Sequence, residues 1–227
     1  MASSDDMKRA AARAALDELP SEGIIGLGTG STTRLFIEAL AEVMKTSPSR
    51  RYVGVPTSEA SRAQASALGI PLLGDDGPWD IAVTVDGADE VDESLDLIKG
   101  GGGAQTREKI VNFSSKRNVI IVDDTKLSKR LGEKWAVPVE VLPFAHLATK
   151  AHLERFGVAT QRQKAGAPFR TDAASFIYDV ACGPIGDPRA LDRAMREIPG
   201  VVETGIFVGR ADVVIVAGVA GIKRLAR

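Results

Sequence analysis

The chain has 227 residues, of which 44% are hydrophobic and 26% are charged, and its formal net charge is -1 at pH 7. This composition is ordinary for a globular protein, and the balance of charges excludes a basic surface field that would attract nucleic acid or anionic lipid. The single cysteine, Cys182, excludes an internal disulfide framework, and no apolar run approaches the ~20 residues of a membrane-spanning helix. Asp5 and Asp6 stand before any hydrophobic stretch, which is wrong for a secretory signal, so we expect a cytoplasmic protein.

The first part of the chain, up to residue 129, alternates between amphipathic helices and short apolar strands. The expected helices span residues 4–19, 33–45, 58–68 and 104–115. The expected strands span residues 23–27, 52–55, 71–73, 80–85 and 118–122. Ser4, Asp5 or Asp6 can cap the first helix, and Pro20 ends it. Such an alternation is typical of a parallel sheet that helices cover on both faces.

Beyond residue 129 the pattern changes. The expected strands are 137–142, 158–163, 175–180 and 201–207, and the expected helices are 145–156 and 188–198. Their order, βαββαβ, is that of a ferredoxin-like split βαβ unit. A strand at 212–217 is expected to return to the first sheet, with a short tail helix after it. We therefore predict a mostly parallel α/β domain of residues 1–129 plus 208–227 and a smaller ferredoxin-like α+β domain of residues 130–207.

Polar segments follow three of the predicted strands, at residues 29–32, 86–89 and 123–126. Ligands of parallel sheets bind beyond the carboxyl ends of the strands. Because all three segments lie at such ends, we expect them to contribute to one binding site.

The glycine-rich turn that begins at Gly26 does not match the dinucleotide-binding fingerprint. Ser31 or Thr33 stands where the third glycine is needed, depending on whether the count starts at Gly26 or Gly28. No lysine precedes the hydroxyl pair, so a Walker A loop is also excluded. The failed dinucleotide fingerprint disfavours a nucleotide-dependent oxidoreductase. Free N–H groups and the helix dipole at such a turn suit one phosphate, whereas an ordinary N-cap by Ser31 or Thr32 explains the motif equally well.

An acidic turn follows the strand that ends near Val85, with Asp86, Asp89, Glu90 and Asp92 within seven residues. Three interpretations stay open: a metal site, a site that binds sugar hydroxyls or moves their protons, and a solvated acidic turn. The spacing misses the calcium-loop pattern and no histidine is near, so we predict no bound metal.

Lys99 precedes four consecutive glycines, residues 100–103, and Glu108 follows them on a predicted helix. Glycines let several backbone N–H groups approach a ligand and adopt conformations closed to other residues. Lys99 or Glu108 alone would be read as an ordinary surface charge. Together with the glycines they predict a site that holds an oxygen-rich substrate, neutralises it and removes a proton from it.

The motifs Gly-Thr-Gly-Ser-Thr at 28–32, Val-Asp-Gly-Ala-Asp-Glu at 85–90, Lys-Gly-Gly-Gly at 99–102 and Thr-Arg-Glu-Lys-Ile at 106–110 resemble those of the type A ribose-5-phosphate isomerases. Further matching segments lie at residues 138–141, 198–202 and 211–213. This resemblance implies a Rossmann-like domain and a ferredoxin-like domain. It also implies an enzyme of the pentose phosphate pathway that interconverts ribose 5-phosphate and ribulose 5-phosphate without a cofactor.

The resemblance implies a role for each matching residue. Glu108 is the catalytic base, which moves a proton from C2 to C1 of the open sugar. Asp86 or Asp89 opens the sugar ring, and Lys99 stabilises the enediolate intermediate. The implied substrate-binding residues are Thr29, Gly30, Ser31, Thr32, Asp86, Gly87, Ala88, Asp89, Lys99, Gly100, Gly101, Gly102, Lys126 and Lys8.

A homodimer that acts on a small phosphosugar, with no nucleic-acid or membrane partner, is likewise implied by the resemblance. The alternative is a non-catalytic sugar-phosphate-sensing domain on a similar scaffold. The presence of Lys99 and Glu108 together with both aspartates favours the enzyme, and the neutral charge offers no DNA-binding surface.

Two positions depart from the family pattern. Members often carry Thr-Asp-Asn-Gly-Asn where this chain has Thr-Asp-Ala-Ala-Ser at residues 171–175, which puts a hairpin of the small domain in doubt. Gly103 stands where members often carry alanine, and we expect this change only to loosen the start of the following helix.

Overall fold

The computed structural model describes residues 3–227. Their contacts divide the chain into two compact units. The first unit holds the described residues up to Ala88, Arg107–Lys126 and Arg210–Arg227, and the second holds Asp89–Thr106 and Leu127–Gly209.

The first unit is built on a six-stranded sheet with the order β15-β14-β6-β3-β1-β2. Its strands are β1 (Glu22–Leu27), β2 (Arg51–Pro56), β3 (Ile81–Asp86), β6 (Asn118–Asp123), β14 (Val213–Gly218) and β15 (Gly221–Ala226). Neighbouring strands run parallel except β14 and β15, which form an antiparallel hairpin. The predicted mostly parallel sheet is therefore confirmed.

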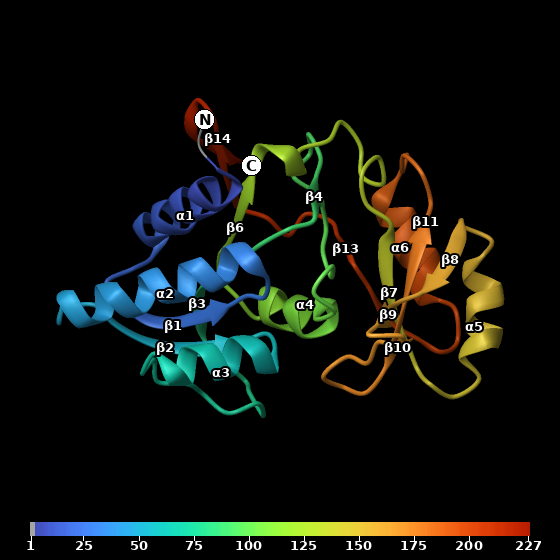
Figure 1. Cartoon of the computed structure of the whole chain (residues 1–227), viewed down its shortest axis with the longest axis horizontal. Helices are drawn as coiled ribbons and strands as arrows, with labels where there is room; N and C mark the ends of the chain where they lie inside the picture. Colours follow the sequence, from blue (N-terminus) through green and yellow to red (C-terminus); the bar gives the residue numbers. More distant parts are fainter. Residues whose placement is uncertain (1–2) are drawn as a thin grey trace. The chain divides into compact units, whose positions relative to one another are not determined.

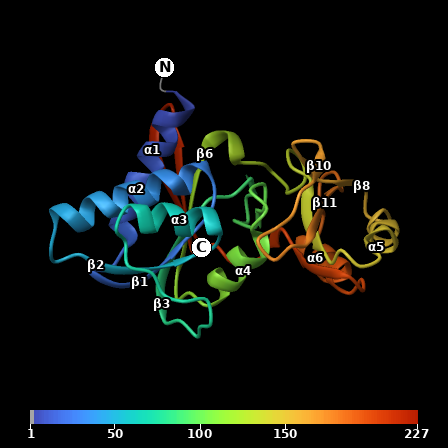
Figure 2. The same ribbon diagram turned by 60° about the horizontal axis from the view of Figure 1, so that its bottom comes forward.

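The helices of this unit are α1 (Ser4–Ala14), the 3₁₀-helix η1 (Ala15–Glu18), α2 (Ser31–Thr46), α3 (Glu59–Ala67), α4 (Gln105–Phe113, of which the first two residues belong to the second unit) and the 3₁₀-helix η2 (Asp124–Lys126). Figures 1 and 2 show α1, α2 and α3 side by side, in contact with the sheet. None of the helices within residues 3–227 combines the length and the apolar character that a membrane crossing requires.

Both faces of the sheet are covered because side chains alternate along each strand. Ile25 and Leu27 of β1 point into the core beneath α1 and α2. Gly26, between them, faces the other side, where Val111 of α4 packs so closely that a Cβ at Gly26 would lie 2.8 Å from Val111 Cγ1.

The cap of α1 is Ser3, so the expected cap at Ser4, Asp5 or Asp6 is wrong. The Ser3 hydroxyl accepts from the Asp6 N–H at 3.1 Å, and the Asp6 carboxylate accepts from the Ser3 N–H at 2.9 Å. This reciprocal pair is a capping box, in which two donors of the first turn are satisfied together. Because every residue from Ser3 to Asp6 is a good cap by itself, composition alone could not choose among them.

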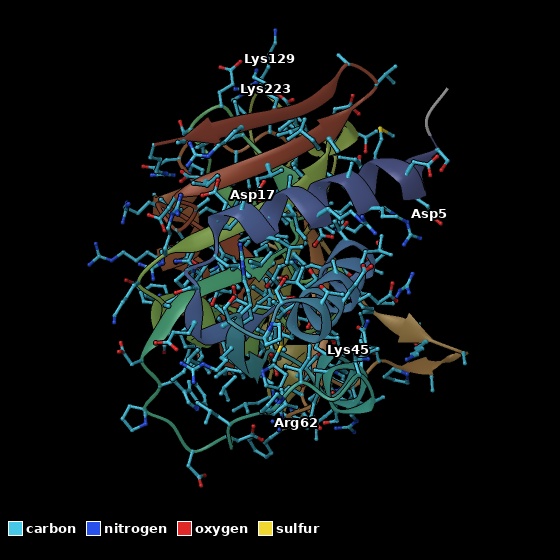
Figure 3. The ribbon with its side chains drawn as sticks, turned by 90° about the vertical axis from the view of Figure 1, so that its left-hand side faces the viewer. Asp5, Asp17, Lys45, Arg62, Lys129 and Lys223 are labelled. Carbon is cyan, nitrogen blue, oxygen red and sulfur yellow. The ribbon has the colours of Figure 1, made fainter. Side chains whose placement is uncertain are left out.

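The expected tail helix is also wrong, because the last residues form β15. Figure 3 shows the β14–β15 hairpin, with Lys223 labelled, beside α1, near whose start Asp5 is labelled; Asp17, also labelled, lies in η1 just after α1. Arg224 of β15 donates from Nε to Glu18 Oε1 at 2.7 Å, and this hydrogen bond lowers the pKa of the Glu18 carboxyl below its ordinary value. Pairing with β14 satisfies backbone groups that a helix would have left exposed on that strand.

The second unit contains a four-stranded antiparallel sheet with the order β12-β7-β11-β8. Its elements are β7 (Val137–Val141), α5 (His146–Leu153), β8 (Val158–Gln161), β11 (Phe176–Ala181), α6 (Pro188–Arg196) and β12 (Val201–Thr204). Leu153 of α5 and Met195 of α6 share one core with Val139 and Tyr178 of the sheet. The chain order is βαββαβ, so the predicted ferredoxin-like fold is confirmed.

Short strands complete this unit. They are β4 (Glu90–Val91), β5 (Leu97–Ile98), β9 (Gln163–Lys164), β10 (Ala167–Pro168) and β13 (Ile206–Phe207). The expected strand 201–207 is interrupted at Gly205, whose N–H donates to Pro138 O at 2.7 Å and whose carbonyl accepts from the Lys99 N–H at 2.8 Å. After this break, β13 leaves the four-stranded sheet and pairs with β5. The expected strand 71–73 of the first unit is reduced to an isolated bridge at Leu72.

The turn at residues 171–175 forms despite its departure from the family pattern. Thr171 N–H donates to Ser175 O at 3.0 Å and Ala174 N–H donates to Thr171 O at 2.8 Å. Ala174 has a φ of 61°, a left-handed conformation that costs an L-residue about 1–2 kcal/mol and costs glycine nothing. The alanine at this position therefore strains the turn.

We expect Ala174→Gly to raise the free energy of unfolding by about 0.5–1 kcal/mol, because the relief of strain exceeds the added freedom of the unfolded chain. Ala173→Gly is the matched control: Ala173 has no positive φ, so that change should lower stability. Urea unfolding of both variants measures the effect. A lower stability for Ala174→Gly would contradict this account of the turn.

Cys182, directly after β11, is partly buried, and burial raises the pKa of its thiol to about 11. The thiolate is the reactive form, so we expect iodoacetamide to alkylate the folded protein slowly at mildly alkaline pH and faster only as the pH approaches that pKa. Intact mass spectrometry follows the reaction. The same chain unfolded in urea is the control and should react at once, whereas equal rates for both would contradict the raised pKa.

Candidate active site

The carboxyl ends of β1, β3 and β6 share one rim of the six-stranded sheet, because these strands are parallel neighbours. Asp86 is the last residue of β3 and is only 2% exposed. Its Oδ1 accepts from the Thr29 N–H at 3.0 Å and from the Gly87 N–H at 2.7 Å, with the Thr33 hydroxyl at 3.4 Å. Backbone donors thus stabilise a buried carboxylate and join two of the segments that the sequence singled out.

Gly28 is required at this contact. Its N–H donates to Val85 O at 3.0 Å, which brings the turn after β1 directly against the end of β3. A Cβ at position 28 would overlap the Asp86 carboxylate, so no other residue fits without displacing it.

The turn after β1 leads into α2, which begins at Ser31 with Gly30 as its N-cap. Gly30 has a φ of 120°, and within residues 3–227 no side chain caps this helix end by a hydrogen bond. No acidic residue stands in the first turn of α2 either. The N–H groups of this turn and the positive end of the helix dipole are therefore suited to an anion.

Thr29 is held in place by three hydroxyl groups that sequence reasoning missed. Its Oγ1 lies 2.7 Å from Thr57 Oγ1, 2.8 Å from Ser58 Oγ and 3.4 Å from Ser61 Oγ. Ser61 Oγ in turn donates to Gly28 O at 2.6 Å. This cluster is buried and ties the turn after β1 to the turn after β2. The sequence does contain a signal for this cluster, because the hydroxyl residues Thr57 and Ser58 directly follow an apolar strand, just as Thr29 comes shortly after β1.

Glu108 lies in the first turn of α4 and is 3% exposed. It precedes Val111 by three residues, so both side chains belong to the helix face that packs on the sheet. Its neighbour Arg107 pairs with Glu59 at 2.7 Å. Lys126 ends η2 after β6 and Lys8 lies on α1, and both are half-buried. Their contact with a ligand stays a prediction.

In the second unit, the glycine segment at residues 100–103 lies against the acidic turn. The Gly101 N–H donates to Asp89 Oδ2 at 2.7 Å, so Asp89 and the glycines are brought together as expected. Gly100 has a φ of 106°, and the Gly103 N–H closes a turn on Gly100 O at 2.9 Å. Lys99, just before this turn, is 2% exposed, and its Nζ lies 5.5 Å from the centre of the Phe207 ring.

Gly103 lies just before the following helix, and its expected loosening of the helix start stays a prediction. It has a φ of 81° and packs so closely on Phe169 that a Cβ would overlap the ring. A glycine is therefore required here for both conformation and space.

Two residues of the four-stranded sheet region, of which one bonds to the glycine segment and the other to Thr106 shortly after it, were missed. Glu140, 2% exposed on β7, accepts from the hydroxyls of Thr106 and Thr171. Arg162, which follows β8, donates from one guanidinium nitrogen to Gly100 O at 2.7 Å and to Gly101 O at 3.2 Å. Glu140 belongs to a motif that carried the family resemblance, whereas nothing near Arg162 in the sequence marked it.

Within residues 3–227, no group of three or more His, Cys, Asp and Glu side chains could hold a metal ion. The acidic turn at residues 86–92 instead uses its carboxylates on the backbone, as in the bonds from Ser94 and Asp96 N–H groups to Asp92 Oδ1 at 2.9 and 2.8 Å. Backbone hydrogen bonds to carboxylates therefore hold this acidic turn together.

Residues 53–221 match the family described as ribose 5-phosphate isomerase A, or phosphoriboisomerase A. The ribose-5-phosphate isomerase A of Desulfatibacillum aliphaticivorans is 44% identical over 227 residues, which cover 99% of each chain. The structure of ribose 5-phosphate isomerase A from Methanocaldococcus jannaschii superposes with a TM-score of 0.93 at 39% identity, over 99% of this chain and 100% of that one. A D-ribose-5-phosphate isomerase in complex with phospho-erythronic acid superposes with a TM-score of 0.96 at 41% identity, again over 99% and 100% of the two chains.

These similarities extend over nearly the whole chain and include the turns after β1 and β3, the glycine segment and the start of α4. The chain belongs to the ribose 5-phosphate isomerase A family.

Proposed function

We propose that the protein interconverts D-ribose 5-phosphate and D-ribulose 5-phosphate, an aldose–ketose isomerisation that uses no cofactor. The observation that carries this proposal is the full-length similarity to enzymes of that name, which includes the segments around Asp86, Lys99 and Glu108. One similar isomerase was solved with phospho-erythronic acid, itself a phosphorylated polyhydroxy acid, which supports a phosphosugar as the substrate.

In this proposal Glu108 is the base that moves the proton. It removes the proton from C2 of the open aldose, which leaves an enediolate, and returns the proton to C1, while the hydroxyl proton of O2 passes to O1 to give the ketose. Its place in the first turn of a helix, with little exposure, supports this role because a buried carboxylate is shielded from competing water.

Asp86 or Asp89 opens the sugar ring by moving a proton from a hydroxyl to the ring oxygen. Both carboxylates already accept backbone N–H donors, so their positions are fixed before a substrate arrives. Lys99 and the N–H groups of Gly100 and Gly102 stabilise the negative oxygen of the enediolate, whereas the Gly101 N–H is engaged by Asp89. Preorganised donors of this kind cost roughly 3–4 kcal/mol each when they are removed.

The phosphate is bound at the start of α2, by the backbone N–H groups and hydroxyls of Gly30, Ser31 and Thr32. Thr29 shapes this turn, since its N–H and hydroxyl are engaged by Asp86 and the hydroxyl cluster. Gly87 and Ala88 bind the sugar through the backbone. Lys126 and Lys8 add positive charge, which supplies binding energy far from the reacting carbons.

Further proposals are a homodimer that works in the pentose phosphate pathway, which comes from the family, and a cytoplasmic location, which comes from the sequence. The domain boundaries at residues 129–130 and 207–208 also stay a prediction. The comparisons give no support to the alternative, a non-catalytic sugar-phosphate-sensing domain, because the similar proteins carry the name of an enzyme.

We expect Glu108→Gln to lower kcat by about 10³-fold or more, because the amide cannot take up a proton. Calorimetric titration with ribose 5-phosphate should show that this variant still binds the sugar. Glu42→Gln, which removes an exposed carboxylate on α2, is the control and should turn over normally. Substantial isomerisation by Glu108→Gln would remove Glu108 from the role of base.

We expect Ser31→Asp to raise KM for ribose 5-phosphate at least about tenfold, because a carboxylate at the start of α2 repels the phosphate. The same carboxylate interacts favourably with the helix dipole, so thermal unfolding should move to a higher temperature by an amount equivalent to about 0.3–1 kcal/mol.

Ser31→Asn is the control of similar size without charge, and its KM should rise less than that of Ser31→Asp, because it loses the hydroxyl but adds no negative charge. An unchanged KM for Ser31→Asp would place the phosphate elsewhere.

A further inference from the structure

The guanidinium of Arg162 bonds both to a carboxylate and to the glycine segment. The Arg162 side chain is 15% exposed. It forms a two-point ion pair with Asp179, from Nε to Oδ2 at 3.0 Å and from the second terminal nitrogen to Oδ1. Its remaining terminal nitrogen donates to the carbonyl oxygens of Gly100 and Gly101.

Arg162 and Asp89 hold the same peptide group from opposite sides. The carbonyl of Gly100 and the N–H of Gly101 belong to one planar peptide and point in opposite directions. The carbonyl oxygen accepts from Arg162 at 2.7 Å, and the N–H donates to Asp89 Oδ2 at 2.7 Å. A cation on the oxygen and an anion on the hydrogen fix the plane of this peptide, and both bonds are strengthened by charge.

Glycine makes this restraint necessary. Gly100 has a φ of 106°, and a peptide between glycines can rotate with little steric cost. Rotation of the plane would remove the donor from Asp89 and turn a carbonyl oxygen toward it. The orientation of Asp89 therefore depends on what holds Gly100 O.

The support for Arg162 comes from a central strand. Asp179 lies on β11, which pairs with β7 on one side and with β8 on the other. The Arg162 N–H donates to Ile177 O of the same strand at 2.9 Å, and the Phe169 ring centre lies 6.0 Å from the guanidinium. The restraint on the glycine segment is thus anchored in the sheet of the second unit.

We propose that Arg162 is a positioning residue of the isomerase, which acts through the Gly100–Gly101 peptide on Asp89 and on the N–H donors of the glycine segment. The proposal rests on the proposed function, because it takes Asp89 and these donors to act on the sugar. Arg162 need not touch the substrate. Its loss should lower the rate of the chemical steps and leave phosphate binding, which belongs to the start of α2, unchanged.

The test compares Arg162→Ala with Arg170→Ala. Arg170 belongs to the same region, is exposed, and donates to Ala174 O rather than to the glycine segment. We expect Arg162→Ala to lower kcat about 100-fold with little change in KM, as displacement of a catalytic group by about 1 Å does. Arg170→Ala should keep the kcat of the unmodified protein. Millimolar guanidinium chloride should raise kcat of Arg162→Ala and leave that of Arg170→Ala unchanged.

A second variant keeps the test decisive if Arg162→Ala fails to fold. Arg162→Lys retains the charge and the apolar stem, but one ammonium cannot bind Asp179 at two points and Gly100 O together. Its kcat should lie between those of Arg162→Ala and the unmodified protein, at unchanged KM and with a normal unfolding temperature.

The outcomes separate the two proposals. If the unmodified protein does not isomerise ribose 5-phosphate, the proposed function fails. If it does, and folded Arg162→Ala or Arg162→Lys has the same kcat, the inference about Arg162 alone is overturned. A rise in KM with unchanged kcat, or a loss in Arg162→Ala that guanidinium does not restore, would overturn it as well.

Discussion

The contact between Gly28 and Asp86 is the constraint on which the first unit depends. A carboxylate can be buried beside the backbone here because no Cβ stands at Gly28 and because N–H groups of Thr29 and Gly87 point at its oxygen. These donors compensate the loss of hydration that burial of a charge entails. The turn after β1 is consequently fixed against the end of β3. Because α2 starts directly after this turn, the position of its first residues is fixed as well.

The second unit uses the same physical device with different residues. The Asp89 carboxylate accepts a backbone N–H of the glycine segment, and Arg162 holds the other side of that peptide. In both units charged side chains are used to fix the backbone rather than simply to pair with one another. A flexible run of glycines can then present its donors in one orientation, at the cost of two charged groups that must stay in place.

The sequence predicted most of the fold because its strong signals are local. Apolar runs such as those of β1, β3 and β6 and the βαββαβ order of the second unit depend on neighbours in the chain. The tail was misread because its apolar residues Ile222, Leu225 and Ala226 have the spacing of one helix face. Pairing with β14 and the bond from Arg224 to Glu18 decide the outcome instead. Two-residue strands such as β4 and β5 are too short to leave a periodic pattern.

The candidate site was predicted only where its residues lie in motifs. Gly28, Asp86 and Lys99 stand out by composition, but the groups that hold them do not. Arg162 lies 62 residues from Gly100 along the chain, and Ser61 lies 32 residues from Thr29. Such contacts form only in the tertiary fold, so they cannot be predicted from the pattern of residues in a single sequence.

The hairpin at the end of the chain has a consequence for how copies of the protein meet. β14 is an uninterrupted apolar strand, and without β15 its free backbone groups would form a template for strand addition by another molecule. β15 covers them, and its exposed Lys223 places a charge on the new edge strand, which disfavours the addition of a further strand. β15 thus hinders the edge-to-edge pairing of strands from different copies that leads to aggregation.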